Sequence, residues 1–319
     1  MWRPALRVLA MTGAIFFPIF TIAQVPAGPT GDFVLRSEAR LVLLDVGVRN
    51  REGAPVSGLG KDDFRVYEDG QLQRITEFSS NDVPVTVGIL VDESFSMRAK
   101  RADVLTAANG FIGRSNPRDE IFILNFNDTV RKGLPAGTPF SDDTEQLRRA
   151  LNRGVPQGKT ALNDAIAAGL DQLRSGHREM KALIVISDGG DNASVHTRRE
   201  ALELVENSLA TIYTIGVFDE EDHDRDPGVL KRLARISGGD AYFPRDAAGL
   251  GPVCQRIAKD LRTRYTVGYV PPLPAGKSTG ALRRIGVKIV APGRGTLKAV
   301  TRSSYEFTES RDMIPGSGE

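Results

Sequence analysis

Short polar side chains stand where the apolar run "VPVTVGIL" ends. In the next stretch, "VDESFS", an acid and two hydroxyls alternate as Asp92, Ser94 and Ser96. Two further positions have a similar placement: Thr160 lies in a loop before a helical pattern, and Asp188 directly follows the apolar run "ALIVIS". In open α/β sheets, ligands bind beyond the carboxyl ends of the strands, near the point where strand order reverses. The five side chains can therefore converge on one site.

Five oxygen ligands suit a hard divalent cation, Mg²⁺ first, with Mn²⁺ or Ca²⁺ as alternatives. Two carboxylates offset the charge of the ion, while three hydroxyls add dipoles but no charge. Such an ion stays electrophilic and keeps one coordination position open for a carboxylate from another molecule. This favours a function in binding. Asp164 and Asp191 are candidates for orienting these ligands; helix capping and turn formation are the alternative for both.

The residues around these positions predict a mostly parallel sheet covered by helices on both faces. Near-continuous apolar runs alternate with helical patterns from 84 to about 262, which is typical of a doubly wound α/β domain. Within "IFILNFNDTVRKGL", the pair Asn127-Asp128 separates two strand-like runs and indicates one antiparallel edge hairpin.

The flanking segments, 34–80 and 263–308, have the patterns of β structure. Asp69-Gly70 lies between two alternating runs, which is a strong hairpin signal. Neither segment is long enough for a good sandwich alone. We therefore expect one discontinuous, sandwich-like β domain into which the α/β domain, 84–262, is inserted. The polar tail, 309–319, is expected to be disordered.

The polar positions in "DESFS", "GKTAL" and "SDGGD", in that order between apolar strands, resemble the metal-ion-dependent adhesion site of von Willebrand factor type A (VWA) domains. That pattern is Asp-x-Ser-x-Ser, then a loop Thr, then a loop Asp. The resemblance covers about 84–262. The flanks are similar to those of exported VWFA-related proteins of the acidobacterial type, a wider match over about 35–308 that implies little about function. The VWA resemblance implies that the metal ligands are Asp92, Ser94, Ser96, Thr160 and Asp188.

The first residues, 1–23, predict a secretory signal peptide. Arg3 and Arg7 precede an apolar stretch, and short residues lie before Gln24 at a plausible cleavage point. The alternative is an uncleaved anchor helix, because the stretch is near the lower length limit for a membrane span. Either interpretation predicts export to the periplasm, the cell surface or the medium, and no later segment could span a membrane.

The composition gives no support for nucleic-acid binding. The net charge is +2, from 42 basic and 40 acidic side chains, and no basic stripe is interleaved with aromatic residues. The single cysteine, Cys254, excludes an intramolecular disulfide. It falls on the apolar face of a helical pattern, so we expect a buried and inert thiol.

Other motifs have simpler interpretations. "GVPQGKT" has only three residues between its glycines where a phosphate-binding loop needs four. "FDEEDHDRDPG" lacks the spacing of an EF-hand and indicates a solvated loop. The three histidines, His177, His196 and His223, stand far apart and lack paired-ligand spacing. Glu93 is expected to point outward as a rim charge; polarising water beside a metal is the alternative.

These patterns predict an exported, Mg²⁺-dependent protein-binding module without enzymatic activity. The resemblance implies that the cation captures an acidic residue of a partner protein. One alternative is a metal-assisted hydrolase that uses the same cation. Another is a structural subunit of a cell-surface assembly. The sequence does not identify the partner, the process, the oligomeric state or the cation bound in the cell.

Overall fold

The computed structural model describes residues 41–307 apart from 81, 219–223 and 272–280. The predicted signal peptide, the predicted tail and His223 lie outside the described residues. Within the described part, no helix is both long enough and apolar enough to cross a membrane.

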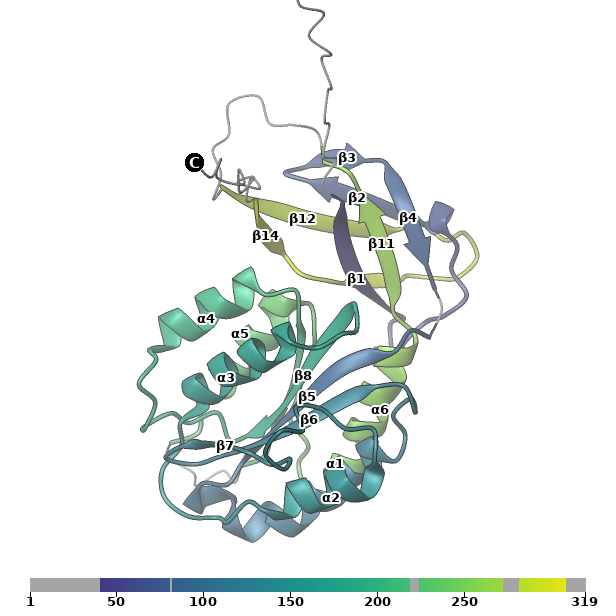
Figure 1. The fold of residues 1–319 in the computed structure, drawn as a ribbon. Coiled ribbons are helices and arrows are strands. Elements are labelled where there is room, and N and C mark those ends of the chain that lie inside the picture. The colour runs from purple at the N-terminus through teal and green to yellow at the C-terminus, as the bar shows by residue number, and fades with distance from the viewer. Residues whose placement is uncertain (1–40, 81, 219–223, 272–280, 308–319) are drawn as a thin grey trace, which may run out of the picture. The chain divides into compact units, whose positions relative to one another are not determined.

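A six-stranded sheet forms the centre of the α/β domain (Figure 1). Its order is β10-β9-β8-β5-β6-β7, and all neighbours are parallel except β6 and β7. The predicted α/β class and the predicted edge hairpin are confirmed. Every residue of β5 is buried, which explains why nearly all of them are apolar or small. The strands are β5 (Val85–Asp92), β6 (Glu120–Phe126), β7 (Val130–Lys132), β8 (Met180–Ser187), β9 (Thr211–Gly216) and β10 (Ala241–Tyr242).

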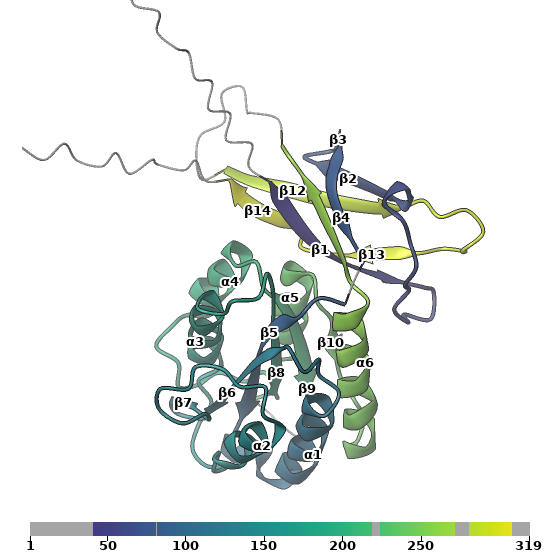
Figure 2. The same cartoon turned by 45° about the vertical axis from the view of Figure 1, so that its right-hand side comes forward.

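Helices cover both faces of this sheet, as Figures 1 and 2 show. One group consists of α1 (Arg101–Ile112), α2 (Thr144–Asn152) and α6 (Leu250–Arg262). The other consists of α3 (Leu162–Arg174), α4 (Arg198–Asn207) and α5 (Pro227–Ser237). Short 3₁₀ turns, η1 (Lys61–Asp63), η2 (Phe95–Lys100) and η3 (Ala247–Gly249), complete the helical elements of the described residues.

The single cysteine lies on the inner face of α6. Cys254 is free and buried, and burial raises the pKa of its thiol to about 12. Burial thus favours the protonated thiol, and the predicted burial of this cysteine is confirmed.

Two four-stranded antiparallel sheets combine strands from before and after the α/β domain. One has the order β13-β1-β11-β4 and the other β14-β12-β2-β3. Side chains from both sheets, among them Leu44, Phe64 and Tyr265, share one apolar core. The strands are β1 (Val42–Arg49), β2 (Phe64–Glu68), β3 (Gln71–Gln73), β4 (Ile75–Ser79), β11 (Tyr265–Tyr269), β12 (Ala281–Ile289), β13 (Lys298–Val300) and β14 (Ser304–Phe307).

The predicted hairpin at Asp69-Gly70 is confirmed. It joins the antiparallel strands β2 and β3, and both residues have positive φ, 48° for Asp69 and 84° for Gly70. Two positive φ values in a two-residue loop are the geometry that Asp-Gly and Asn-Gly sequences favour, because it matches the twist of the strands.

The domain boundaries lead to a first prediction. A fragment of 34–80 should be unfolded or aggregated, because β1, β2 and β4 would lose the partners that β11, β12 and β13 provide and would expose open edges. A fragment of 82–263 retains the whole six-stranded sheet and should fold alone. Circular dichroism melts and gel filtration of both fragments, beside residues 34–308 as the control, would check this. A monomeric 34–80 fragment with a cooperative melt would contradict a discontinuous β domain.

Candidate metal centre

The site begins at the carboxyl end of β5, where the strand order reverses. Strand β6 lies on one side of β5 and β8 on the other, which is where α/β sheets bind ligands. Asp92, the last residue of β5, is only 2% exposed. Its Oδ1 accepts a hydrogen bond from the Ser94 amide at 2.9 Å, and its Oδ2 accepts one from the Ser187 hydroxyl at 2.6 Å. Both oxygens are thus held in a fixed orientation.

A chain of hydroxyls links this strand end to the end of β8. The hydroxyls of Ser94 and Ser96 lie 3.1 Å apart, and the Ser96 hydroxyl donates to Asp188 Oδ2 at 2.5 Å. Asp188 Oδ1 accepts from the Gly190 amide at 2.9 Å. Gly189 has a φ of 88°, which lets the chain turn sharply directly after this carboxylate.

The fifth predicted residue lies in the loop between these two strand ends. Thr160 is 5% exposed, and its amide donates to Asn192 Oδ1 at 2.9 Å. Its carbonyl oxygen accepts from the amides of Asn192 and Ala193. On the other side, the Gly158 carbonyl accepts from the Phe95 amide. The loop that carries Thr160 is therefore bonded to both other loops of the site.

The structure thus brings four of the predicted side chains into one hydrogen-bonded group, and places Thr160 in the loop beside it. Among the described residues, neither Asp92 nor Asp188 has a basic partner in an ion pair. Burial and the negative charge of Asp188 raise the pKa of Asp92 to about 7, although hydrogen bonds from Ser187 and Ser94 oppose this. Two buried acids without a counter-charge are costly for a fold to keep.

A cation here would depend on these two acids and on hydroxyl oxygens. In the part of the chain that the structure describes, no group of three or more His, Cys, Asp or Glu side chains could hold a metal. The donors are oxygen atoms alone, which fits Mg²⁺ or Mn²⁺ and not a metal that prefers nitrogen or sulfur.

The expectation for Glu93 was wrong. Its side chain is not a rim charge but is 2% exposed, and its Oε2 accepts from Arg101 Nε at 2.8 Å. Arg101 also donates to the Gly154 carbonyl at 2.7 Å. Burial raises the pKa of Glu93 more than Arg101 lowers it. The physical reason is that Arg101, at the start of α1, turns inward and offsets a charge that would otherwise need solvent.

Gly154 provides the space that Glu93 occupies, and this gives a second prediction. A Cβ at Gly154 would overlap the Glu93 carboxyl group, so Gly154→Ala should destabilise the protein by about 1–3 kcal/mol. Gly251→Ala is the matched control, because a Cβ at Gly251 in α6 meets nothing within 4 Å. Urea unfolding of both variants would check this. Equal stability of the two variants would contradict the close packing of Glu93.

Asp164 and Asp191 hold the loop after β8 against the start of α3. Asp164 accepts hydrogen bonds from the amides of Val195 and His196, at 2.9 and 2.8 Å. Asp191 accepts from the Asn163 amide at 2.7 Å and from the Ser194 hydroxyl at 2.6 Å. Within the described residues neither acid is bonded to the five predicted ligands. These hydrogen bonds of Asp164 and Asp191 are the ones expected for helix capping and turn formation. That the two acids also orient the metal ligands stays a prediction.

In the part of the chain that the structure describes, neither His196 nor His177 is bonded to the five predicted ligands. His196 contacts Asp164, with Nδ1 2.7 Å from Oδ1, and His177 contacts Glu120 at the amino end of β6. In "GVPQGKT", Gly158 has a φ of 76° and the amide of Lys159 donates to Asp128. Part of the acidic stretch at 218–228 lies outside the described residues.

Sequence reasoning missed two residues that support the site. Ser187 is fully buried and donates to Asp92, and the side chain of Asn192 accepts from the Thr160 amide. Ser187 ends an otherwise apolar strand directly before Asp188, and a hydroxyl in such a position is a signal that could have found it. Asn192 follows a turn sequence, where asparagine is common, and carries no such signal.

Comparisons with known proteins find the same fold as that of the α/β domain. Residues 87–190 match a family model described as von Willebrand factor type A domain. A search of curated proteins returns no match. A solved structure described as von Willebrand factor type A from Catenulispora acidiphila has a TM-score of 0.50 and 17% sequence identity. The similarity covers 87% of this chain and 76% of that chain.

Two further solved structures have TM-scores of 0.47. The proximal thread matrix protein 1 from the mussel byssus is 16% identical, over 57% of this chain and 49% of that chain, so the match spans about half of that protein. The von Willebrand factor domain of the type V pili tip protein Mfa5 from Porphyromonas gingivalis is 14% identical, over 56% of this chain and 97% of that chain. The family match and the Catenulispora structure show that the α/β part of this chain has the fold of a VWA domain.

Proposed function

We propose that this chain is an exported protein-binding module whose VWA domain holds Mg²⁺ and uses it to capture an acidic residue of a partner. The observation that carries the proposal is the pair of buried acids, Asp92 and Asp188, joined through the hydroxyls of Ser94 and Ser96. A divalent cation would supply the counter-charge that the described residues do not. Thr160 would complete the set of ligands that the VWA resemblance implies.

The charge of the ligand set supports binding of an acid. Two carboxylates offset the charge of a divalent ion, and the neutral hydroxyls do not reduce its attraction for a further anion. A carboxylate from a partner is the hard, anionic oxygen ligand that Mg²⁺ prefers. The site therefore fits a protein ligand with one exposed Asp or Glu.

Exposed apolar side chains around the site fit a protein partner better than a small substrate. Phe95, between the two serines, is 63% exposed, Val155 in the loop before Thr160 is 53% exposed, and Val195 in the loop after Asp188 is 89% exposed. Arg98 lies over the Phe95 ring, 4.7 Å from its centroid. Aromatic and Arg side chains are enriched in protein interfaces.

The hydrolase alternative lacks a supporting contact in the described residues. A serine nucleophile needs an adjacent base, yet His196 contacts Asp164, His177 contacts Glu120, and Glu93 is paired with Arg101. Turnover of a panel of esters and phosphoesters, lost in Asp92→Asn, would favour the hydrolase. Association with a partner that is independent of metal would favour the structural-subunit alternative.

The proposal is tested by capturing the partner. The purified protein and its Asp188→Ala variant serve as baits for the exported fraction, each with Mg²⁺ and with EDTA. We expect at least one protein to be retained only by the unchanged bait with Mg²⁺. The same proteins retained in all four conditions would contradict metal-dependent binding. Mass spectrometry of the exported chain would test cleavage of the predicted signal peptide, which predicts a mature start near Gln24.

A further inference from the structure

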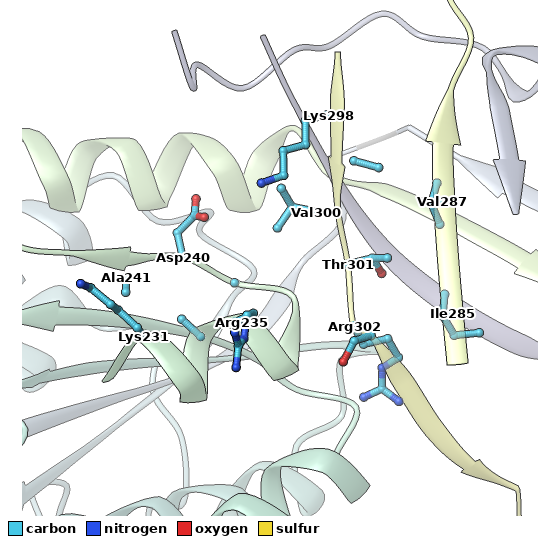
Figure 3. Close-up of a pocket in the computed structure, with 14 residues that line it drawn as sticks. Lys231, Arg235, Asp240, Ala241, Ile285, Val287, Lys298, Val300, Thr301 and Arg302 are labelled. Atoms are coloured by element: carbon cyan, nitrogen blue, oxygen red, sulfur yellow. The ribbon is translucent and has the colours of Figure 1, made fainter. Parts of the chain in front are cut away.

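A pocket of about 410 Å³ lies at the opposite end of the α/β domain from the candidate metal centre. One wall is formed by α5 and the turn 238–241 that leads into β10, and the other by β12, β13 and the segment after β13. Figure 3 shows Lys231 and Arg235 on the first wall and Lys298 on the second. Because the turn enters β10, the pocket lies at the amino end of a parallel strand, whereas Asp92 lies at a carboxyl end.

The two walls are fixed to each other by close backbone packing. Gly238 has a φ of 79° and lies so close to the main chain of Thr301 and Arg302 that a Cβ would overlap it. The buried side chain of Arg264 donates to the Gly238 carbonyl at 3.0 Å and to the Val300 carbonyl at 3.4 Å. One guanidinium group thus joins both walls, so the pocket is formed before any ligand binds.

The pocket has a positive charge that its own acid does not offset. In the described part of the chain, Lys231, Arg235 and Lys298 form no ion pair with an acid. The acid that lines the pocket, Asp240, is paired with Arg49, whose Nη2 lies 2.5 Å from Asp240 Oδ2. The Lys231 ammonium lies over the Phe243 ring, 5.2 Å from its centroid, which leaves its charge in place. The three basic groups therefore keep a positive charge that an anion can contact.

Apolar side chains form part of the second wall, beside the polar groups of Lys298, Thr301 and Arg302. Ile285 and Val287 of β12 and Val300 of β13 are half-buried and line the pocket beside Lys298 (Figure 3). A pocket of a few hundred Å³ with apolar walls and a few convergent polar groups is typical of a site for a small molecule. Inorganic phosphate would leave these apolar side chains without a contact.

We propose that this pocket binds a small organic anion with carboxylate or phosphate groups and an apolar body. The anionic groups contact Arg235, Lys298 and Lys231, and the apolar body lies against Ile285 and Val287. The site does not involve the metal, so it stands or falls independently of the proposed capture of a partner.

Isothermal calorimetry with three probes tests the proposal: phenyl phosphate, isophthalate and inorganic phosphate, all in EDTA. We expect phenyl phosphate, isophthalate or both to bind, and to bind at least tenfold more weakly to the double variant Arg235→Gln, Lys298→Gln. Which of the two binds more tightly identifies the anionic group. Arg232→Gln is the control, because Arg232 is exposed on the same helix but does not line the pocket.

Three results would overturn the proposal. One is that neither aromatic compound binds at millimolar concentration. Another is that the double variant, with an unchanged melting temperature, binds as tightly as the unchanged protein. The third is that inorganic phosphate binds as tightly as the aromatic compounds, because the apolar side chains would then contribute nothing.

Discussion

Chelation of the cation, Asp188→Ala, and removal of the partner's acidic residue are each expected to weaken partner binding by more than about a hundredfold. A carboxylate within a few ångströms of a divalent ion gains several kcal/mol of Coulomb energy at an effective dielectric of about 20, before desolvation is subtracted. A net loss of about 3 kcal/mol is already enough for this effect. The three changes break one and the same contact.

Their combined effect therefore distinguishes a metal bridge from independent contacts. Effects at independent sites multiply in affinity, whereas changes to one contact do not add. In EDTA, the Asp188→Ala variant should bind the partner no more weakly than the unchanged protein does. Surface plasmon resonance on the captured partner would measure this. Effects that multiply, or an unchanged affinity after chelation, would show that the metal is not the bridge.

The second large effect is expected for Asp92→Asn, which should lose detectable Mg²⁺ and Mn²⁺ binding. The change removes half of the ligand charge and keeps the size of the side chain. Its amide oxygen can still accept from the Ser94 amide, and its NH₂ group can donate to the Ser187 hydroxyl. The loss of cation binding would therefore result from the missing charge and not from a change in structure.

The same variant should be more stable than the unchanged protein when no cation is present. Burial and Asp188 raise the pKa of Asp92 to about 7, so an ionised Asp92 at pH 8 destabilises the folded state. The amide that replaces this carboxylate carries no charge, so the melting temperature of the variant in EDTA at pH 8 should be higher by a few degrees. Titration calorimetry and thermal melts measure both effects.

Asp119→Asn is the matched control for this variant. Asp119 is also a buried acid, but it directly precedes β6, at the amino end of the strands, where it accepts from the Val85 amide of β5 and pairs with Arg262. Its change should lower the stability and leave the metal affinity unchanged. If Asp92→Asn instead keeps its affinity, or loses stability in EDTA as Asp119→Asn does, then Asp92 has a structural role and does not bind a cation.

Much of the fold could be predicted because its signals are local. The eight residues of β5 are all buried, so nearly all are apolar or small, and this run is visible in the sequence. The Asp69-Gly70 turn needs two positive φ values, which few residue pairs other than Asp-Gly or Asn-Gly allow. Such features depend on neighbours in the chain and not on distant contacts.

The candidate site could be predicted for a different reason. Parallel strands bring their carboxyl ends to one edge of the sheet, so Asp92 and Asp188, which are far apart in the chain, meet as soon as β5 and β8 pair. Glu93 was placed wrongly because its burial depends on Arg101 and on the absence of a side chain at Gly154. No periodicity or spacing encodes that pair.

Contacts between the β domain and the α/β domain were also beyond prediction. Arg264 forms an ion pair with Asp45 of β1 at 2.6 Å and with Asp260 of α6 at 3.2 Å. Its guanidinium also lies 3.1 Å from the Tyr213 hydroxyl of β9. Each of these residues looks like an ordinary polar position in the sequence. Their burial arises from the docking of two domains, which leaves no local pattern.

Anomalous X-ray diffraction from crystals grown with Mn²⁺ would show whether a cation binds between the two acids. We expect one strong anomalous peak between the carboxyl ends of β5 and β8, and no such peak in Asp92→Asn crystals. The oxygens around that peak should come, directly or through water, from Asp92, Ser94, Ser96, Thr160 and Asp188. The absence of a peak at this position in the unchanged protein, or an equal peak in Asp92→Asn, would contradict cation binding by these residues.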